Sequence, residues 1–220
     1  MRQPKAALFD LDGVIFDTER QYDVFWGAQC RKYHPEHPGL EQEIKGQTLV
    51  QIFDRHFGGD EMAAAREEIT AGLNDFEAQM SYDYIRGFEA FLADLRRHGV
   101  KTAVVTSSNQ PKMESVYHAR PEFPRLFDAI LTSEDFTESK PSPQCYLRAA
   151  ERVGATAEDS VVFEDSINGL RSGLAAKMFV VGLVTTNPLD KVATLSHIQI
   201  NDYQCFTFET LTSKIQWQAI

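Results

Sequence analysis

The chain has 220 residues, of which 43% are hydrophobic and 11% aromatic, so it can bury a sizeable core as one large domain or two unequal ones. Its net charge of −10 argues against nucleic acid or an anionic membrane as the default partner. A phosphorylated ligand is not excluded, because a cation inside one cleft can reverse the local field.

The cysteines Cys30, Cys145 and Cys205 are few, scattered and without metal-ligand spacing. They predict reduced thiols in a reducing compartment. No apolar segment approaches the length of a membrane span. We therefore expect a cytoplasmic protein with no membrane or nucleic-acid partner, and a monomer.

The first predicted strand is the continuous apolar run Ala6–Phe9, a pattern typical of a parallel sheet covered on both faces. Asp10 and Asp12 follow it, and Gly13 allows a sharp turn. Reactive sites of open α/β sheets lie beyond the carboxyl ends of the strands. Two carboxylates at such a place repel each other unless a cation or a shared proton relieves the repulsion. The pair therefore indicates a functional site. The alternative is an ordinary turn, in which Asp and Gly are also common.

The segment from Thr18 to Tyr82 shows helical spacing of its apolar residues and no convincing strand. Gly58-Gly59 interrupts it, and Ala63-Ala64-Ala65 restarts a helix. This predicts a helical insertion after the first strand.

From Gly87 onward, predicted strands and helices alternate. A helix over 88–98 ends before Gly99, and Pro111 begins another behind Ser108 or Asn109 as its cap. The remaining elements are strands at 102–105, 129–131, 161–163 and 179–181, a weaker edge strand at 198–200, and a last helix over 206–220 anchored by Trp217. The alternation predicts a parallel sheet in an α/β fold.

Polar side chains also follow the later strands. They are Thr106, Ser107, Ser108 and Asn109 after the second strand, Lys140 after the third, and Glu164 with Asp165 after the fourth. Magnesium-assisted phosphoryl transfer requires such groups, since oxygen ligands hold Mg²⁺, cations neutralise phosphoryl oxygens and a carboxylate can be the nucleophile. Taken singly, they are more typical of helix caps or a surface lysine. Their placement at successive strand ends favours a site.

Four motifs resemble those of the haloacid dehalogenase-like hydrolase superfamily, in order and at suitable intervals. They are FDLDGV at 9–14, VVTSS at 104–108, SKPSP at 139–143 and VVFEDSINGLRSG at 161–173. The chain is most similar to the β-phosphoglucomutase-like phosphatase group. The resemblance implies a Rossmann-like, doubly wound parallel sheet as the core, residues 1–17 and 83–220. It also implies a small C1-type helical cap domain, residues 18–82.

The resemblance assigns the catalytic roles by position. Asp10 would be the nucleophile that forms an aspartyl-phosphate, and Asp12 the general acid and base. Thr106 would bind a phosphoryl oxygen with help from Ser107, and Lys140 would bridge the nucleophile and the phosphate. An acid at Asp12 indicates phosphate esters rather than the dehalogenase branch, because a halide leaving group needs no proton.

The resemblance also implies Mg²⁺ as the cofactor. Its ligands would be the Asp10 carboxylate, the Asp12 backbone carbonyl and Asp165, with Glu164 in or near the shell.

The cap decides between two activities. True β-phosphoglucomutases supply cap cations for a second phosphate, and the aligned positions here are Tyr22, Leu49 and Leu73. The absence of cations at these three positions favours a phosphatase acting on a small phosphorylated metabolite, such as a sugar or polyol phosphate. A phosphomutase is the alternative, and a non-catalytic binding protein on the same fold is a lesser one.

The expected substrate-binding residues are Tyr22, Trp26, Lys45 and Gln47 from the cap, with Ser107 and Asn109 from the core. Trp26 matches a tryptophan of the mutases and is equally compatible with a place in the cap's apolar core. Lys45 begins the segment Lys45-Gly46-Gln47-Thr48, which retains a Lys-Gly turn of the mutases, and a surface charge is the alternative for this lysine.

Overall fold

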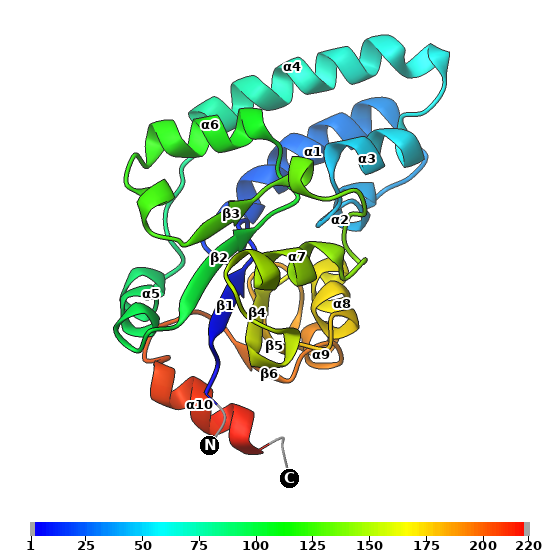
Figure 1. The fold of residues 1–220 in the computed structure, drawn as a ribbon. Helices are drawn as coiled ribbons and strands as arrows, with labels where there is room; N and C mark the ends of the chain where they lie inside the picture. Colours follow the sequence, from blue (N-terminus) through cyan, green and yellow to red (C-terminus); the bar gives the residue numbers. More distant parts are fainter. Residues whose placement is uncertain (1–2, 218–220) are drawn as a thin grey trace.

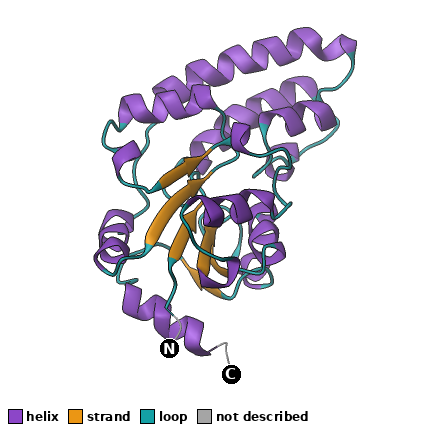
Figure 2. Cartoon of the chain, in the orientation of Figure 1, coloured by secondary structure: helices purple, strands orange, loops and turns teal. Residues whose placement is uncertain are grey.

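A computed structural model of the chain describes residues 3–217, except for the side chains of residues 216 and 217. One parallel sheet lies at its centre, with its strands in the order β3-β2-β1-β4-β5-β6 (Figures 1 and 2). The strands are β1 (Ala6–Phe9), β2 (Lys101–Val105), β3 (Ala129–Leu131), β4 (Ser160–Glu164), β5 (Phe179–Leu183) and β6 (Ile198–Ile200). The predicted parallel sheet is confirmed, with Ile198–Ile200 as its edge strand.

Helices cover both faces of the sheet, which explains the continuous apolar run of β1. Ala7 and Phe9 belong to one apolar cluster, and Ala6 and Leu8 belong to another. The first cluster includes side chains of α5 (Phe88–Arg97), α6 (Gln110–Ala119) and α10 (Phe208–Trp217), and the second includes side chains of α7 (Gln144–Arg152), α8 (Ile167–Ala175) and α9 (Leu189–Ala193). Successive β1 side chains point to opposite faces, so each face receives apolar residues.

The segment between β1 and α5 is helical and lies over one end of the sheet (Figure 1). Its helices are α1 (Glu19–Tyr33), α2 (Leu40–Glu43), α3 (Leu49–His56) and α4 (Ala63–Gln79). They enclose a third apolar cluster that includes Phe25, Trp26 and Phe57. The structure thus has a helical cap inserted after the first strand; its exact limits at residues 18 and 82 stay a prediction.

Single turns of 3₁₀ helix complete the described elements. They are η1 (Asp60–Met62), η2 (Phe123–Arg125), η3 (Ser133–Asp135) and η4 (Ala157–Asp159).

Several predicted helix ends are confirmed by local geometry. Asn109 caps α6 by accepting a hydrogen bond from the Lys112 N–H at 3.2 Å, with Pro111 in the first turn. Gly99 follows α5 with φ +73°, a left-handed conformation that glycine adopts without strain. The side chain of Trp217, the expected anchor of α10, lies outside the described residues.

The three cysteines are free thiols. Within residues 3–217, no helix is both long and apolar enough to cross a membrane.

The order of the strands creates a switch point beside β1. The chain passes from β1 to β2 and β3 on one side, and then returns to β4 on the other side of β1. Phe9 pairs with Phe163, and the Asp10 N–H donates to the Phe163 carbonyl at 3.0 Å. The residues after β1 and β4 therefore meet where ligands bind in open α/β sheets.

Candidate active site

A cavity of about 960 Å³ lies between the carboxyl ends of the strands and the cap. Most of the residues predicted as a site line it: Asp10, Asp12, Thr106, Ser107, Asn109 and Asp165 from the core, and Tyr22, Trp26, Lys45 and Gln47 from the cap. Lys140 and Glu164 are not among the lining residues and lie buried next to Asp10. The structure therefore brings the predicted core and cap residues together around one space.

Lys140 is buried between two carboxylates. Its Nζ lies 2.6 Å from Asp10 Oδ1 and 2.6 Å from Glu164 Oε1, and it also donates to the Val105 carbonyl at 3.1 Å. Burial alone would lower the pKa of Lys140, but Asp10 and Glu164 raise it above its usual value, so the amine stays charged. The alternative of a solvated surface lysine is wrong, since only 2% of Lys140 is exposed.

Both carboxylate oxygens of Glu164 accept hydrogen bonds. Its Oε1 accepts from Lys140 and from the Tyr146 hydroxyl at 2.8 Å. Its Oε2 accepts from the Asp165 N–H at 3.0 Å and from the N–H and Oγ of Ser166 at 3.2 and 3.1 Å. The cap of α8 is Ser166, which accepts from the Gly169 N–H at 3.0 Å. The helix-cap alternative for Glu164 is therefore wrong.

A group of three carboxylates fits a divalent cation. Asp10, Glu164 and Asp165 each offer an oxygen, and these oxygens lie within 4.8 Å of one another. Burial raises the pKa of Asp10 to about 7 in spite of the opposing charge of Lys140. Burial, with Glu19, Glu164 and Asp10 adding to it, also raises the pKa of Asp165 well above its usual value. Buried carboxylates with this mutual repulsion are the oxygen donors that Mg²⁺ takes, and a cation would relieve the repulsion.

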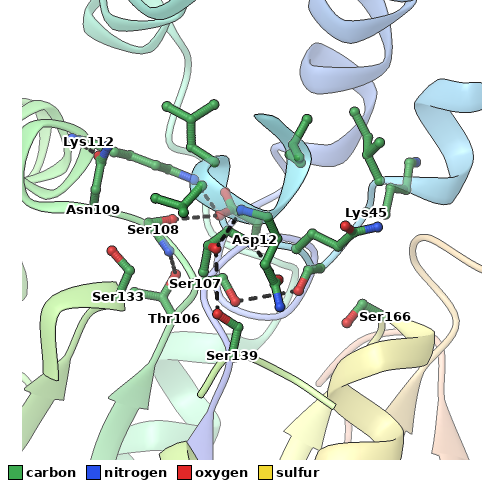
Figure 3. A pocket seen from close by; sticks show the side chains of 18 of the residues that line it. Asp12, Lys45, Thr106, Ser107, Ser108, Asn109, Lys112, Ser133, Ser139 and Ser166 are labelled. Carbon is green, nitrogen blue, oxygen red and sulfur yellow. Dashed lines mark hydrogen bonds and ion pairs between the residues drawn. The ribbon is translucent and has the colours of Figure 1, made fainter. Parts of the chain in front are cut away.

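The Asp12 carboxylate is held by donors on both of its oxygens. The Thr18 hydroxyl donates to Oδ1 at 2.6 Å, and the Ser108 hydroxyl donates to Oδ2 at 3.4 Å. The same Oδ2 forms a close ion pair with Lys112 Nζ. Figure 3 shows Lys112 reaching from α6 toward Asp12.

Lys112 was not predicted as a site residue, and it is buried with 3% of its surface exposed. Its one sequence signal is its place three residues after Asn109, in the first turn of the helix that follows the VVTSS motif.

The hydroxyl residues after β2 form one wall of the cavity (Figure 3). Thr106 is buried, its N–H donates to the Leu131 carbonyl at 3.0 Å, and its Oγ1 accepts from the Ser108 N–H at 3.0 Å. Ser107 donates to the carbonyl of Gly46 in the cap at 3.5 Å. Asn109 caps α6 and also lines the cavity; its role in substrate binding stays a prediction.

Two of the predicted cap residues have aromatic side chains. The Tyr22 hydroxyl donates to Glu77 at 2.7 Å. Burial raises the pKa of that glutamate, with Lys112 opposing the shift. Trp26 is 8% exposed and packs edge-on against Phe25 at a ring distance of 5.5 Å. Trp26 therefore belongs to the apolar core of the cap and also borders the cavity.

The polar cap residues are already paired. Lys45 Nζ lies 2.7 Å from Asp23 and 3.2 Å from Glu19, and its side chain is only 12% exposed. The surface-charge alternative for Lys45 is therefore wrong. Gln47 donates to the Glu43 carbonyl at 2.9 Å and accepts from Arg55 at 3.2 Å.

A sequence model of the family "Haloacid dehalogenase-like hydrolase" matches residues 7–183. Validoxylamine A 7'-phosphate phosphatase of Streptomyces hygroscopicus subsp. limoneus is 28% identical, over 86% of this chain and 90% of that protein. Hexitol phosphatase A of Escherichia coli is 29% identical, over 81% of this chain and 82% of that protein.

Solved structures share the fold. The β-phosphoglucomutase of Clostridium difficile superposes with a TM-score of 0.80 at 19% identity, over 99% of each chain. The family match covers most of the sequence and contains the residues that meet at the switch point. The chain therefore belongs to the haloacid dehalogenase-like hydrolase family.

Proposed function

We propose that the protein is a Mg²⁺-dependent phosphatase that hydrolyses a small phosphorylated metabolite, a sugar or polyol phosphate, through an aspartyl-phosphate on Asp10. One observation carries the proposal. Asp10 lies at the switch point of the sheet, 2.6 Å from the buried ammonium of Lys140, and faces a cavity that it shares with Asp12. A binding site alone needs neither a nucleophile nor an adjacent acid.

In the first half of the reaction, a carboxylate oxygen of Asp10 attacks phosphorus. The Asp10 O–P bond forms as the ester P–O bond breaks, and Asp12, which is protonated at the start of this half, gives its proton to the leaving oxygen. Lys140 offsets the negative charge of the nucleophile and the phosphoryl oxygens, and the Thr106 hydroxyl and Ser107 donate hydrogen bonds to those oxygens.

In the second half, Asp12 takes a proton from a water molecule whose oxygen attacks the same phosphorus. The Asp10 O–P bond breaks, phosphate leaves, and both aspartates return to their starting states.

The carboxylates of Asp10 and Asp165 and the backbone carbonyl of Asp12 would hold the magnesium. When bound, Mg²⁺ neutralises charge on the phosphoryl oxygens. Glu164 lies in the same acidic group, but its oxygens already accept hydrogen bonds from Lys140, Tyr146, Asp165 and Ser166. We assign Glu164 to the anchoring of Lys140, beside the metal shell.

The cap supports a monophosphate substrate rather than the bisphosphate of a mutase. Leu49 and Leu73, which stand at the positions of mutase cations, are apolar and line the cavity. Lys45 is paired with Glu19 and Asp23. A second phosphate at Lys45 would have to break that pairing. Arg55 of the cap also lines the cavity, where it donates to Gln47 at 3.2 Å. The relatives include both phosphatases and a β-phosphoglucomutase, so similarity alone does not separate the two activities. We prefer the phosphatase because of the cap residues Leu49, Leu73 and Lys45.

The test is magnesium-dependent phosphate release from phosphorylated sugars, polyols, nucleotides and pyrophosphate, together with β-glucose 1-phosphate and a bisphosphate primer. Steady release from one class of compound supports the phosphatase. Isomerisation of the hexose phosphate without release would replace it with the mutase. Neither reaction, from a folded protein, would favour the non-catalytic binding protein.

A further inference from the structure

Lys112 occupies an unfavourable place for a purely structural lysine. It is the third residue of α6 after the Asn109 cap, where the positive end of the helix dipole disfavours a cation. It is also buried, and a buried ammonium is costly unless it is paired. The ion pair with Asp12 is therefore the contact that accounts for its position.

Lys112 also lies where the core meets the cap. The α6 helix and Asp12 belong to the core, whereas the Tyr22 ring, 4.6 Å from Lys112 Nζ, comes from α1 of the cap. The Tyr22 hydroxyl is held in turn by Glu77 on α4. The ammonium thus lies between the carboxylate that it contacts and an aromatic face that covers it, a favourable arrangement for a cation.

We infer that Lys112 is a positioning residue, which fixes the orientation of the Asp12 carboxyl group so that, in its protonated form, it faces the leaving oxygen. Thr18, at the start of the cap, donates to one oxygen of Asp12, and the other oxygen is contacted closely by Lys112 and more distantly, at 3.4 Å, by Ser108. With both oxygens held, the carboxylate cannot turn freely about its side-chain bonds. The Tyr22 ring keeps Lys112 in place when the cap covers the cavity. This inference rests on the proposed phosphatase activity.

The test compares two leaving groups in one preparation of enzyme. An alkyl phosphate from the best substrate class needs its leaving oxygen protonated, whereas p-nitrophenyl phosphate releases a stable phenolate that needs little help. The value of kcat/KM covers the steps up to formation of the phosphoenzyme, so it contains the acid step and excludes the later action of Asp12 as a base. The ratio of the two kcat/KM values is independent of the fraction of folded enzyme.

We expect Lys112→Met to lower the alkyl-to-aryl ratio by about 10- to 100-fold, the scale of a misplaced catalytic group. Lys112→Arg should restore part of the ratio. Lys101→Met, which removes a surface lysine paired with Asp128, is the matched control and should leave the ratio unchanged. Adding Lys112→Met to Asp12→Asn should lower the ratio no further, because the group that it positions is already gone.

An equal loss of both activities in Lys112→Met would overturn the inference, since a merely structural role predicts that result. An unchanged ratio at full activity would overturn it as well. If the wild-type protein, folded and supplied with Mg²⁺, hydrolyses no phosphate ester, the proposed function itself fails, and the inference fails with it.

Discussion

At the residue scale, the buried ammonium of Lys140 shares its charge between Asp10 and Glu164, at 2.6 Å from each. Glu164 is fully buried, and its two carboxylate oxygens accept hydrogen bonds from Lys140, Tyr146, Asp165 and Ser166. The surroundings of Asp10 and Glu164 therefore differ. Asp10 lines the cavity, as the proposed nucleophile must, whereas Glu164 is not among the lining residues and contacts the lysine.

Asp10→Asn should abolish turnover and leave the fold intact. The amide cannot act as the nucleophile, and loss of a reacting group costs at least about 1000-fold in kcat. Phosphate release measures the activity, and circular dichroism checks the fold. Full activity in this variant would rule out the role of Asp10 as nucleophile.

Glu164→Gln should lower the free energy of unfolding by about 1–3 kcal/mol, because the new amide N–H₂ faces donors in either orientation: Lys140 on one side, or backbone N–H groups on the other. Tyr146→Phe is the matched control: it removes one hydroxyl donor from Glu164 and should cost about 1 kcal/mol. Urea unfolding measures both variants. Stability equal to the wild type in Glu164→Gln would contradict the account of Glu164 as a saturated acceptor.

The sequence predicted Asp10, Asp12, Lys140 and Asp165, because each follows a predicted strand and the ends of parallel strands meet. Lys112 could not be found in this way. It comes from inside a helix, and only the packing of that helix against the cap carries its amine to Asp12.

At the element scale, the loop after α2 docks the cap onto the core. Gly46 has φ +73°, and a Cβ on it would collide with the Ser166 side chain. The carbonyl of Lys45 accepts from Asn168 at 3.4 Å, and Thr48 lies 3.5 Å from the Ser139 hydroxyl. The loop thus contacts the segments after β3 and β4, which border the cavity.

Gly46→Ala should lower kcat/KM for the substrate by about 10-fold, because the added methyl group pushes the loop away from Ser166 and displaces cap groups from the cavity. Gly39→Ala is the matched control. It has the same sign of φ, at +91°, but a Cβ there has no atom within 4 Å. Both substitutions strain the backbone by about 1 kcal/mol. Equal kinetic effects in the two variants would mean that docking of this loop does not matter.

The sequence predicted the elements well where local chemistry determines them. Asn109 and Pro111 identified the start of α6, and Gly99 identified the end of α5. The helical spacing of apolar residues predicted that the cap is helical, but not the partner against which each side chain packs. Trp26 illustrates the limit: it packs on Phe25 and also borders the cavity.

At the scale of the whole molecule, the cap holds a buried carboxylate that links stability to pH. Burial raises the pKa of Glu77 above its ordinary value, with the charge of Lys112 opposing the shift. A carboxyl group whose folded pKa is raised stabilises the fold most below its unfolded pKa of about 4.3. That contribution is lost as the pH rises through the folded pKa.

The isosteric Glu77→Gln variant stays neutral at every pH and keeps an acceptor for Tyr22. Relative to this variant, the wild type should therefore lose stability as the pH rises from about 4.3 toward neutral, by about 1.4 kcal/mol for each unit by which the pKa of Glu77 is raised. Urea unfolding of both proteins across this range measures the difference. A difference that is constant with pH would show that burial does not perturb Glu77.

The central claim, that phosphate passes through Asp10, is tested most directly by rapid acid quenching during turnover with Mg²⁺ and the best substrate, followed by mass spectrometry of the peptides. The account predicts a phosphoryl group on Asp10, and none in the Asp10→Asn variant. Steady release of phosphate from an enzyme whose quenched peptides never carry a phosphoryl group on Asp10 would contradict it.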